Sequence, residues 1–132
     1  MGRADDAARR ADLAAQQARI ESAEAQKLID RFLVDVADAG IAPVPIKISL
    51  PSGASVRTDR EGWYLKRNHS LAIGTDGGYY QLSLIAIGWR ERLKGVRLTP
   101  TPPPLIVSRG GRDGETGYLT EFLAWILDGT LR

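Results

Sequence analysis

The first part of this chain is one long stretch without glycine or proline, and its small or apolar side chains recur at alternating steps of four and three residues. All 14 charged side chains of residues 3–39 lie off this stripe. Because nothing in the stretch interrupts a helix and the spacing keeps one face uncharged, residues 3–39 are predicted to form a single helix. The stripe consists of Ala4, Ala8, Ala11, Ala15, Ala18, Ser22, Ala25, Ile29, Phe32, Val36 and Ala39.

This helix is too long for a compact domain of 132 residues. At about 1.5 Å per residue it spans about 55 Å, whereas such a domain is about 35 Å across. Residues 25–39 offer a wide face of large apolar side chains, which is typical of a helix docked on a sheet. Residues 1–24 offer mainly alanine methyl groups, each contributing about 0.8 kcal/mol when buried. We therefore expect an Ala-rich helical extension that packs against a second chain, frays, or breaks near Ser22.

After Gly40 the hydrophobic period changes from helical to two, and Gly40 with Pro43 is predicted to end the helix. Residues 45–107 are predicted to form an antiparallel sheet of four to six strands, with a loop at 58–62. Asp76-Gly77-Gly78 marks the turn of a hairpin, because glycines adopt the positive φ that tight turns need. The expected strands are 45–50, a weak one around 56, 63–66, 71–75, 79–87, 96–98 and 105–107.

Three further segments connect or follow these strands. Residues 88–95 (GWRERLKG) are compatible with a helical turn or a loop, and 100–104 (PTPPP) with a stiff extended linker. Residues 117–128 are predicted to be a helix, because their apolar residues recur at helical spacing and Gly129 ends the pattern.

The predicted fold class is α+β, in one domain over residues 1–132. The long N-terminal helix and the C-terminal helix would pack on the same face of an antiparallel meander, and the other face would be solvated.

Composition narrows the class of protein. The chain is 43% hydrophobic and 26% charged, as in soluble globular proteins, and it has no apolar run of membrane-spanning length. It has no cysteine, and the segment after Met1 is acidic rather than apolar, so we expect a cytoplasmic protein without a secretory signal. The excess of arginine over lysine, together with abundant alanine, suggests a GC-rich bacterial source.

The net charge of +2 is unevenly distributed. Residues 46–98 carry nine basic and four acidic side chains, whereas residues 3–39 carry six basic and eight acidic ones. A basic segment attracts nucleic acid or another anion. Most of these cations are isolated along the sequence, which also fits an ordinary solvated sheet face.

Residues for catalysis or metal binding are sparse. His69 is the single histidine, and no nucleophile motif, zinc spacing or calcium-loop pattern is present. We therefore predict no metal site, no cofactor and no enzymatic activity.

The glycine-rich segment 109–117 (RGGRDGETG) precedes the predicted last helix. Backbone amides at a helix start favour an anion, and Arg109, Gly110, Gly111 and Arg112 are the candidate ligand-binding residues. Asp113 and Glu115 would repel a phosphate, so a polar loop that caps the helix is the alternative.

Five aromatic residues gather in the sheet region, and we expect core packing to account for most of them, with a ligand surface as the alternative. They are Trp63, Tyr64, Tyr79, Tyr80 and Trp89.

The sequence favours a non-enzymatic interaction or regulatory module. It would self-associate as a homodimer through Ala4, Ala8, Ala11, Ala15, Ala18 and Ser22, and another protein is a possible partner. The alternative is a binder of nucleic acid or an anionic ligand that uses the basic sheet segment and loop 109–117. A third hypothesis is an enzyme with a site at His69 or at carboxylates. No membrane partner is expected.

Overall fold

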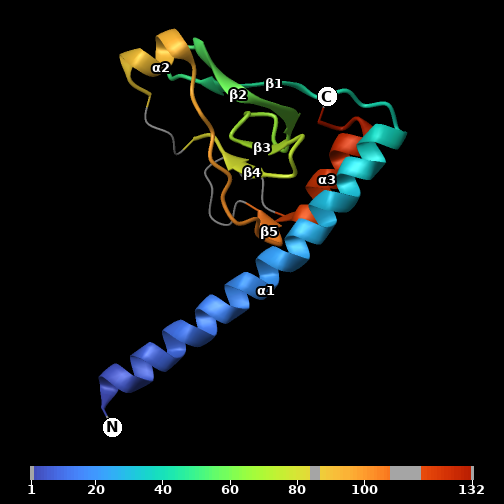
Figure 1. Ribbon diagram of the computed structural model, residues 1–132. Helices are drawn as coiled ribbons and strands as arrows, with labels where there is room; N and C mark the ends of the chain where they lie inside the picture. The colour runs from blue at the N-terminus through green and yellow to red at the C-terminus, as the bar shows by residue number, and fades with distance from the viewer. Residues whose placement is uncertain (1, 84–86, 108–116, 132) are drawn as a thin grey trace.

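The chain folds as an α+β protein with a helix at each end of a four-stranded antiparallel sheet (Figure 1). The computed structural model describes residues 2–83, 87–107 and 117–131. The elements are α1 (Arg3–Asp38), β1 (Val44–Ser49), β2 (Ser55–Tyr64), β3 (Leu71–Gly74), β4 (Tyr79–Gln81), α2 (Trp89–Lys94), β5 (Ile106–Val107), β6 (Gly117–Tyr118) and α3 (Leu119–Asp128).

Helix α1 confirms the predicted long helix and ends within one residue of the expected position. Gly40 adopts a φ of 70°, its N–H donates to the carbonyl of Ala37, and the N–H of Ile41 donates to the carbonyl of Val36. These two hydrogen bonds form a Schellman motif, in which the left-handed glycine lets the chain turn back and satisfy the last carbonyls. Gly40 is therefore the helix stop that the sequence indicated.

The sheet has the strand order β1-β2-β3-β4, and every neighbouring pair is antiparallel. The predicted hairpin is confirmed between β3 and β4. Gly77 has a φ of 82°, and the N–H of Gly74 donates to the carbonyl of Gly78 across the turn. The predicted strand 79–87 is shorter than expected, because β4 ends at Gln81, and residues 84–86 lie outside the described residues.

The predicted loop at 58–62 was wrong, because these residues belong to β2. The β1–β2 register shifts between Pro45 and Lys47, so β2 bulges there. The Thr58 hydroxyl donates to the carbonyl of Ile46 at 2.6 Å and accepts from the N–H of Arg60 at 3.2 Å. The polar run 58–62 thus stays in the strand, because the Thr58 hydroxyl replaces backbone hydrogen bonds that the bulge removes.

The main core lies between one face of the sheet and the two long helices. From α1 it receives the second half of the stripe, and α3 contributes its own apolar face, so the two helices pack side by side (Figure 1). This confirms that both helices cover one face. The buried residues are Ala25, Ile29, Phe32, Val36, Trp63, Leu65, Leu71, Ile73, Tyr79, Val107, Leu119, Phe122, Leu123 and Ile126.

The opposite face of the sheet is not solvated, contrary to expectation, because the chain after α2 pairs with the edges of β2 and β4 and closes a second core. Val96 forms a parallel bridge with Thr58, and Val96 and Leu98 are buried. The other buried members of this second cluster are Ile46, Ile48, Val56, Ala72, Tyr80 and Leu82.

Two ambiguous segments are resolved. Residues 89–94 form the short helix α2. Residues 117–118, which the sequence placed in the last helix, instead form β6, which pairs with β5 in a separate two-stranded sheet. Helix α3 therefore begins at Leu119, where the N–H of that residue donates to the carbonyl of Leu105.

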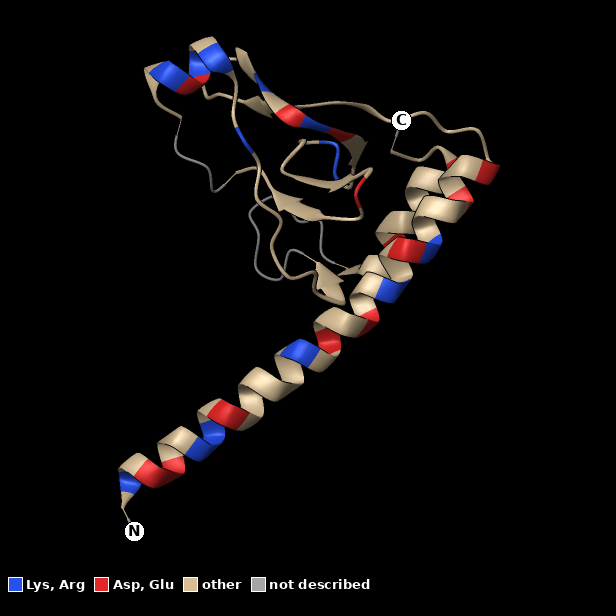
Figure 2. Cartoon of the chain, in the orientation of Figure 1, with Lys and Arg blue, Asp and Glu red and all other residues tan. Residues whose placement is uncertain are grey.

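The first half of α1 projects away from the rest of the molecule (Figure 1). Every residue from 3 to 20 is exposed, whereas Ala25, Ile29, Phe32 and Val36 are buried. Acidic and basic residues alternate along the projection (Figure 2). Among the described residues, no helix combines the length and the apolarity needed to cross a membrane.

Candidate functional site

Helix α1 carries the first candidate surface, which we name the alanine seam: Ala4, Ala8, Ala11, Ala15, Ala18 and Ser22. Ala4 to Ala18 are exposed, and Ser22 is half-buried where the helix meets the rest of the molecule. The seam continues the line of the buried residues Ala25 and Ile29 on the same helix. Its exposed part therefore faces the side on which the sheet lies, but below the sheet.

A long-range hydrogen bond ties α1 to the rest of the molecule at the point where the helix begins to project. Glu21 Oε1 accepts from the N–H of Leu105 at 3.0 Å, just before β5. Beside this contact lies an open hollow of about 630 Å³, lined by one side of the helix and by Leu105. The helix residues that line it are Ala14, Gln17, Ala18, Ile20, Glu21 and Glu24. The corner between helix and body is thus a shallow, partly apolar step.

A second candidate surface lies where β1, β2 and α2 meet, and we name it the basic corner: Lys47, Arg57, Arg90, Arg92, Lys94 and Arg97. All six side chains are exposed. Figure 2 shows α2 mostly blue with one red segment, and blue and red segments in turn along the neighbouring strand. Lys47 and Arg57 are direct partners in the β1–β2 register, so two like charges face each other across the ladder. Such a pair is destabilising unless an anion lies nearby.

Two hollows open between these cations and share Arg57. One, of about 350 Å³, is lined by Lys47, Ser55, Val56, Arg57, Arg92 and Leu93. The other, of about 290 Å³, is lined by Arg57, Thr58, Asp59, Lys94, Gly95, Val96 and Arg97. Asp59 is the one carboxylate in either lining, and its Oδ1 already accepts from the N–H of Leu98 at 2.8 Å. Both hollows therefore present mainly positive charge.

Helix α2 stands over this corner and has no buried residue. Arg57 Nη2 donates to the carbonyl of Leu93 at 3.2 Å, which ties the helix to β2. Trp89 and Leu93, one helical turn apart, are each 69% exposed. The Arg90 guanidinium lies 5.5 Å from the Trp89 ring centroid, within the range of a cation–π contact. Most of the five sheet-region aromatics are packed, as expected, but Trp89 is not.

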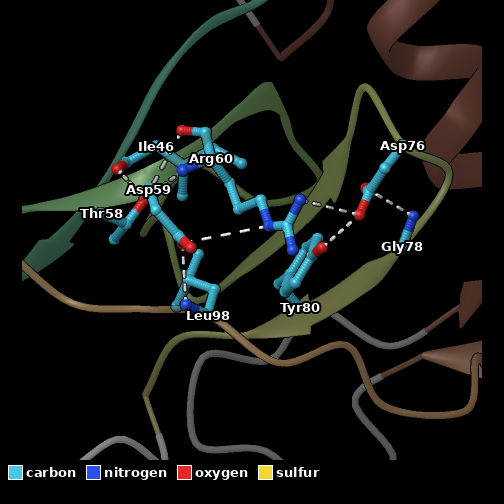
Figure 3. A network of polar contacts seen from close by, with 8 residues as sticks. All are labelled: Ile46, Thr58, Asp59, Arg60, Asp76, Gly78, Tyr80 and Leu98. Atoms are coloured by element: carbon cyan, nitrogen blue, oxygen red, sulfur yellow. Dashed lines mark hydrogen bonds and ion pairs between the residues drawn. The ribbon is translucent and has the colours of Figure 1, made fainter.

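A polar network joins β2, the β3–β4 turn and the segment after α2 (Figure 3). Asp76 Oδ2 accepts from the Tyr80 hydroxyl at 2.6 Å and pairs with Arg60 Nη1 at 3.4 Å, while Asp76 Oδ1 accepts from the N–H of Gly78 at 2.9 Å. Arg60 Nε also lies 3.9 Å from Asp59 Oδ1. The network fastens the hairpin turn to the middle of β2.

The titration of this network follows its contacts. Burial acts to raise the pKa of Asp76, but the hydrogen bonds from Tyr80 and Gly78 and the charge of Arg60 outweigh it, so the pKa is lowered. Burial raises the pKa of Tyr80 to about 12, with a further contribution from the Asp76 hydrogen bond. Both groups thus stay in their neutral-pH forms, which suits a structural lock more than proton transfer.

The other residues that the sequence suggested as functional have less structural support. His69 is exposed, with a φ of 59°, and its ring stacks on Tyr64 at a centroid distance of 3.8 Å. No group of three metal-ligating side chains occurs within the described ranges. Arg109, Gly110, Gly111 and Arg112 lie outside the described residues, so the proposed anion loop has no geometry to report.

The basic corner was not singled out from the sequence as a site. The charge of residues 46–98 was the available signal, but the facing of Lys47 and Arg57 depends on the β1–β2 register. The exposure of Trp89 depends in turn on how α2 stands on β2.

Comparisons of the chain with the models of known protein families, with curated proteins and with solved structures gave no match.

Proposed function

We propose that the protein is a non-enzymatic interaction module that self-associates through the alanine seam. The observation that carries this proposal is the exposure of every residue from 3 to 20 on a helix whose stripe is buried from Ala25 to Val36. Helices in proteins draw most of their stability from packing of one face, and residues 3–20 of α1 have no such packing within the described chain. A second helix on the seam would supply that packing.

The geometry favours an antiparallel pair of chains. From Ala25 to Val36 the same stripe is already covered by the sheet and α3. A parallel partner helix that followed the seam would therefore run into its neighbour's body near Glu21 and Leu105. An antiparallel partner avoids this collision, since the two bodies would lie at opposite ends of the helix pair. Its N-terminus would reach the corner beside Leu105.

Charge and size suit a weak dimer. Asp5 and Arg19 flank the seam near its two ends, so antiparallel pairing brings opposite charges together twice, while Asp12 between them faces its own copy and weakens the pair. The overlapping helices would be about 30 Å long and about 10 Å wide, which is at the small end of specific interfaces. We therefore expect a micromolar rather than a nanomolar dissociation constant.

Sedimentation velocity at protein concentrations of about 1–500 µM, which bracket a micromolar dissociation constant, tests the proposal. Ala15→Glu places a charge in the seam and should leave a monomer at every concentration. Gln16→Glu, the matched control, adds the same charge outside the seam, about 100° around the helix from Ala15, and should dimerise like the unchanged chain. A wild-type chain that stays monomeric throughout, or equal behaviour of the two variants, overturns the proposal.

Disulfide trapping tests the orientation, because the chain has no cysteine of its own. A mixture of Ala4→Cys and Ser22→Cys chains should form a mixed disulfide under mild oxidation, because full antiparallel overlap of the seam places these two residues opposite each other. Ala4→Cys alone should link poorly, because antiparallel pairing separates the two copies of this residue. Efficient linking of Ala4→Cys with itself would show a parallel pair instead.

The cellular setting is also part of the proposal. We place the protein in the cytoplasm of a bacterium, on the support of its cysteine-free, arginine-rich composition.

A further inference from the structure

The basic corner combines unpaired positive charge with exposed apolar side chains, and it is independent of the alanine seam. Its six cations make no ion pair within the described parts of the chain. We propose that α2 and the adjoining surface of β1 and β2 form a docking surface for an anionic phospholipid bilayer, on which the protein adsorbs without crossing it. The expectation of no membrane partner rests on the lack of a membrane-spanning run in the sequence, but adsorption to the surface of a bilayer needs no such run.

The charge argument begins with Lys47 and Arg57. They face each other on one side of the β1–β2 ladder, and Arg92 lines the same hollow. Arg57 is shared with the second hollow, which Lys94 and Arg97 also line. Phosphate groups of lipid headgroups would fill both hollows and relieve the like-charge pair. Clusters of this kind are attracted to the negative surface of a cytoplasmic leaflet.

The side chains of α2 favour a bilayer over nucleic acid as the anionic partner of this surface. At 100° per residue, Trp89 and Leu93 lie side by side, with Arg90 and Lys94 on one flank and Arg92 on the other. Glu91 lies on the opposite side, where its Oε2 accepts from the N–H of Gly88 at 3.1 Å. An apolar pair between cations is the pattern of a helix lying in a membrane interface. Nucleic acid would use the Trp89 ring and the cations, but it offers no apolar layer for Leu93.

Cosedimentation with vesicles measures the proposed binding. Vesicles of phosphatidylserine and phosphatidylcholine should pellet the unchanged protein at low salt, whereas pure phosphatidylcholine should not, and added salt should release it. Removing one cation should lower the partition coefficient about fivefold. The triple variant Lys47→Gln/Arg92→Gln/Lys94→Gln should therefore lose about 100-fold.

The matched control removes the same net charge elsewhere. Arg3, Arg9 and Lys27 are exposed on α1, so Arg3→Gln/Arg9→Gln/Lys27→Gln should bind within about threefold of the unchanged chain. A similar loss in both triple variants would show attraction by net charge alone and would overturn the docking surface.

The apolar part of the surface has its own readout. Trp63 is buried and Trp125 is half-buried, so the exposed Trp89 should be the tryptophan that brominated lipids quench. Trp89→Phe should abolish the quenching, and Trp89→Ser/Leu93→Ser should lower binding at least tenfold. Leu13→Ser/Val34→Ser, which alters two exposed apolar residues of α1, is the control and should bind normally. Because α2 has no buried residue, the α2 variants should keep the circular dichroism and melting temperature of the parent.

Two results would overturn the proposal. One is the absence of binding to the anionic vesicles at low salt. The other is binding of a single-stranded oligonucleotide, followed by fluorescence anisotropy, with no quenching of Trp89 by brominated vesicles. The Ala15→Glu chain should still bind vesicles, with lower apparent affinity if dimers engage two surfaces, so failure of self-association is distinguishable from failure of docking.

Discussion

Lys47 and Arg57 oppose each other directly across the β1–β2 ladder, on the side of the sheet away from Ile46, Ile48 and Val56. Neither side chain has an acidic partner among the described residues. Like charges that face each other weaken the pairing of antiparallel strands. The two cations therefore destabilise the β1–β2 pair, and a single substitution would remove their repulsion.

Lys47→Glu should stabilise the fold, because it converts the repulsive cross-strand pair into an attractive one. We expect a gain of about 0.5–1 kcal/mol in the free energy of unfolding, measured by urea denaturation at low salt. The same change in an Arg57→Gln background should give no gain, because its partner charge is gone. An equal gain in both backgrounds would show that the pair does not interact.

Gly62→Ala should destabilise the protein by about 3 kcal/mol or more. A Cβ atom at this position would lie 1.9 Å from the carbonyl oxygen of Ile73 and 2.8 Å from the Cα of Gly74, both of them backbone atoms of the neighbouring strand. The β2–β3 ladder would have to open to admit it. Thermal melting measures the effect. Gly2→Ala, where the added atom meets nothing within 4 Å, is the control and should melt like the parent.

Asp76 should make the protein less stable in acid. Its pKa is lowered in the folded state, so it binds fewer protons there than in the unfolded chain. Its stabilising contribution is present above its unfolded pKa of about 3.9 and is lost as the pH falls through the folded pKa. Asp76→Asn should flatten the dependence of the unfolding free energy on pH between about 5 and 3. Asp12→Asn, on the projecting part of α1, should leave the slope unchanged.

Tyr79 and Tyr80 should make the protein less stable in strong alkali. Burial raises the pKa of each to about 12, so in the folded state they keep protons that the unfolded chain releases near pH 10. Stability should therefore decrease as the pH rises from about 10 to 12. Absorbance of tyrosinate should show Tyr79 and Tyr80 titrating near pH 12. Tyr80→Phe should remove one of these late steps, and a titration curve with no tyrosine ionising above about pH 11 would contradict the burial argument.

Elements set by local pattern were predictable from the sequence. Helix α1, its stop at Gly40 and the β3–β4 hairpin each rest on the periodicity or turn chemistry of neighbouring residues. The same holds for most of α3, although its start was misplaced because Gly117 and Tyr118 pair with β5. That pairing joins residues about ten apart and leaves no local signal.

Features set by distant contacts were not predictable. Thr58 to Gly62 read as a loop because the run is polar, yet the Thr58 hydroxyl and the ladder to β1 keep it in a strand. The second core needed Val96 and Leu98 to lie across the sheet, which their sequence neighbours do not indicate. The basic corner depends on the β2 strand and on the second core, because its cations come from β1, β2, α2 and the segment after α2, which meet only in the fold.

The continuity of α1 also has a mechanical consequence. No glycine or proline interrupts α1 between Arg3 and Asp38. The helix is therefore rigid, and it fixes the direction in which the seam faces relative to the sheet. Each residue added between Ser22 and Ala25 would rotate the projection by 100° and advance it by about 1.5 Å. Insertion of one residue would turn the seam away from the side on which the sheet lies. Insertion of seven residues would return the seam to nearly its original direction, about 10 Å further from the sheet. Whatever the seam binds is therefore held at a set angle to the sheet.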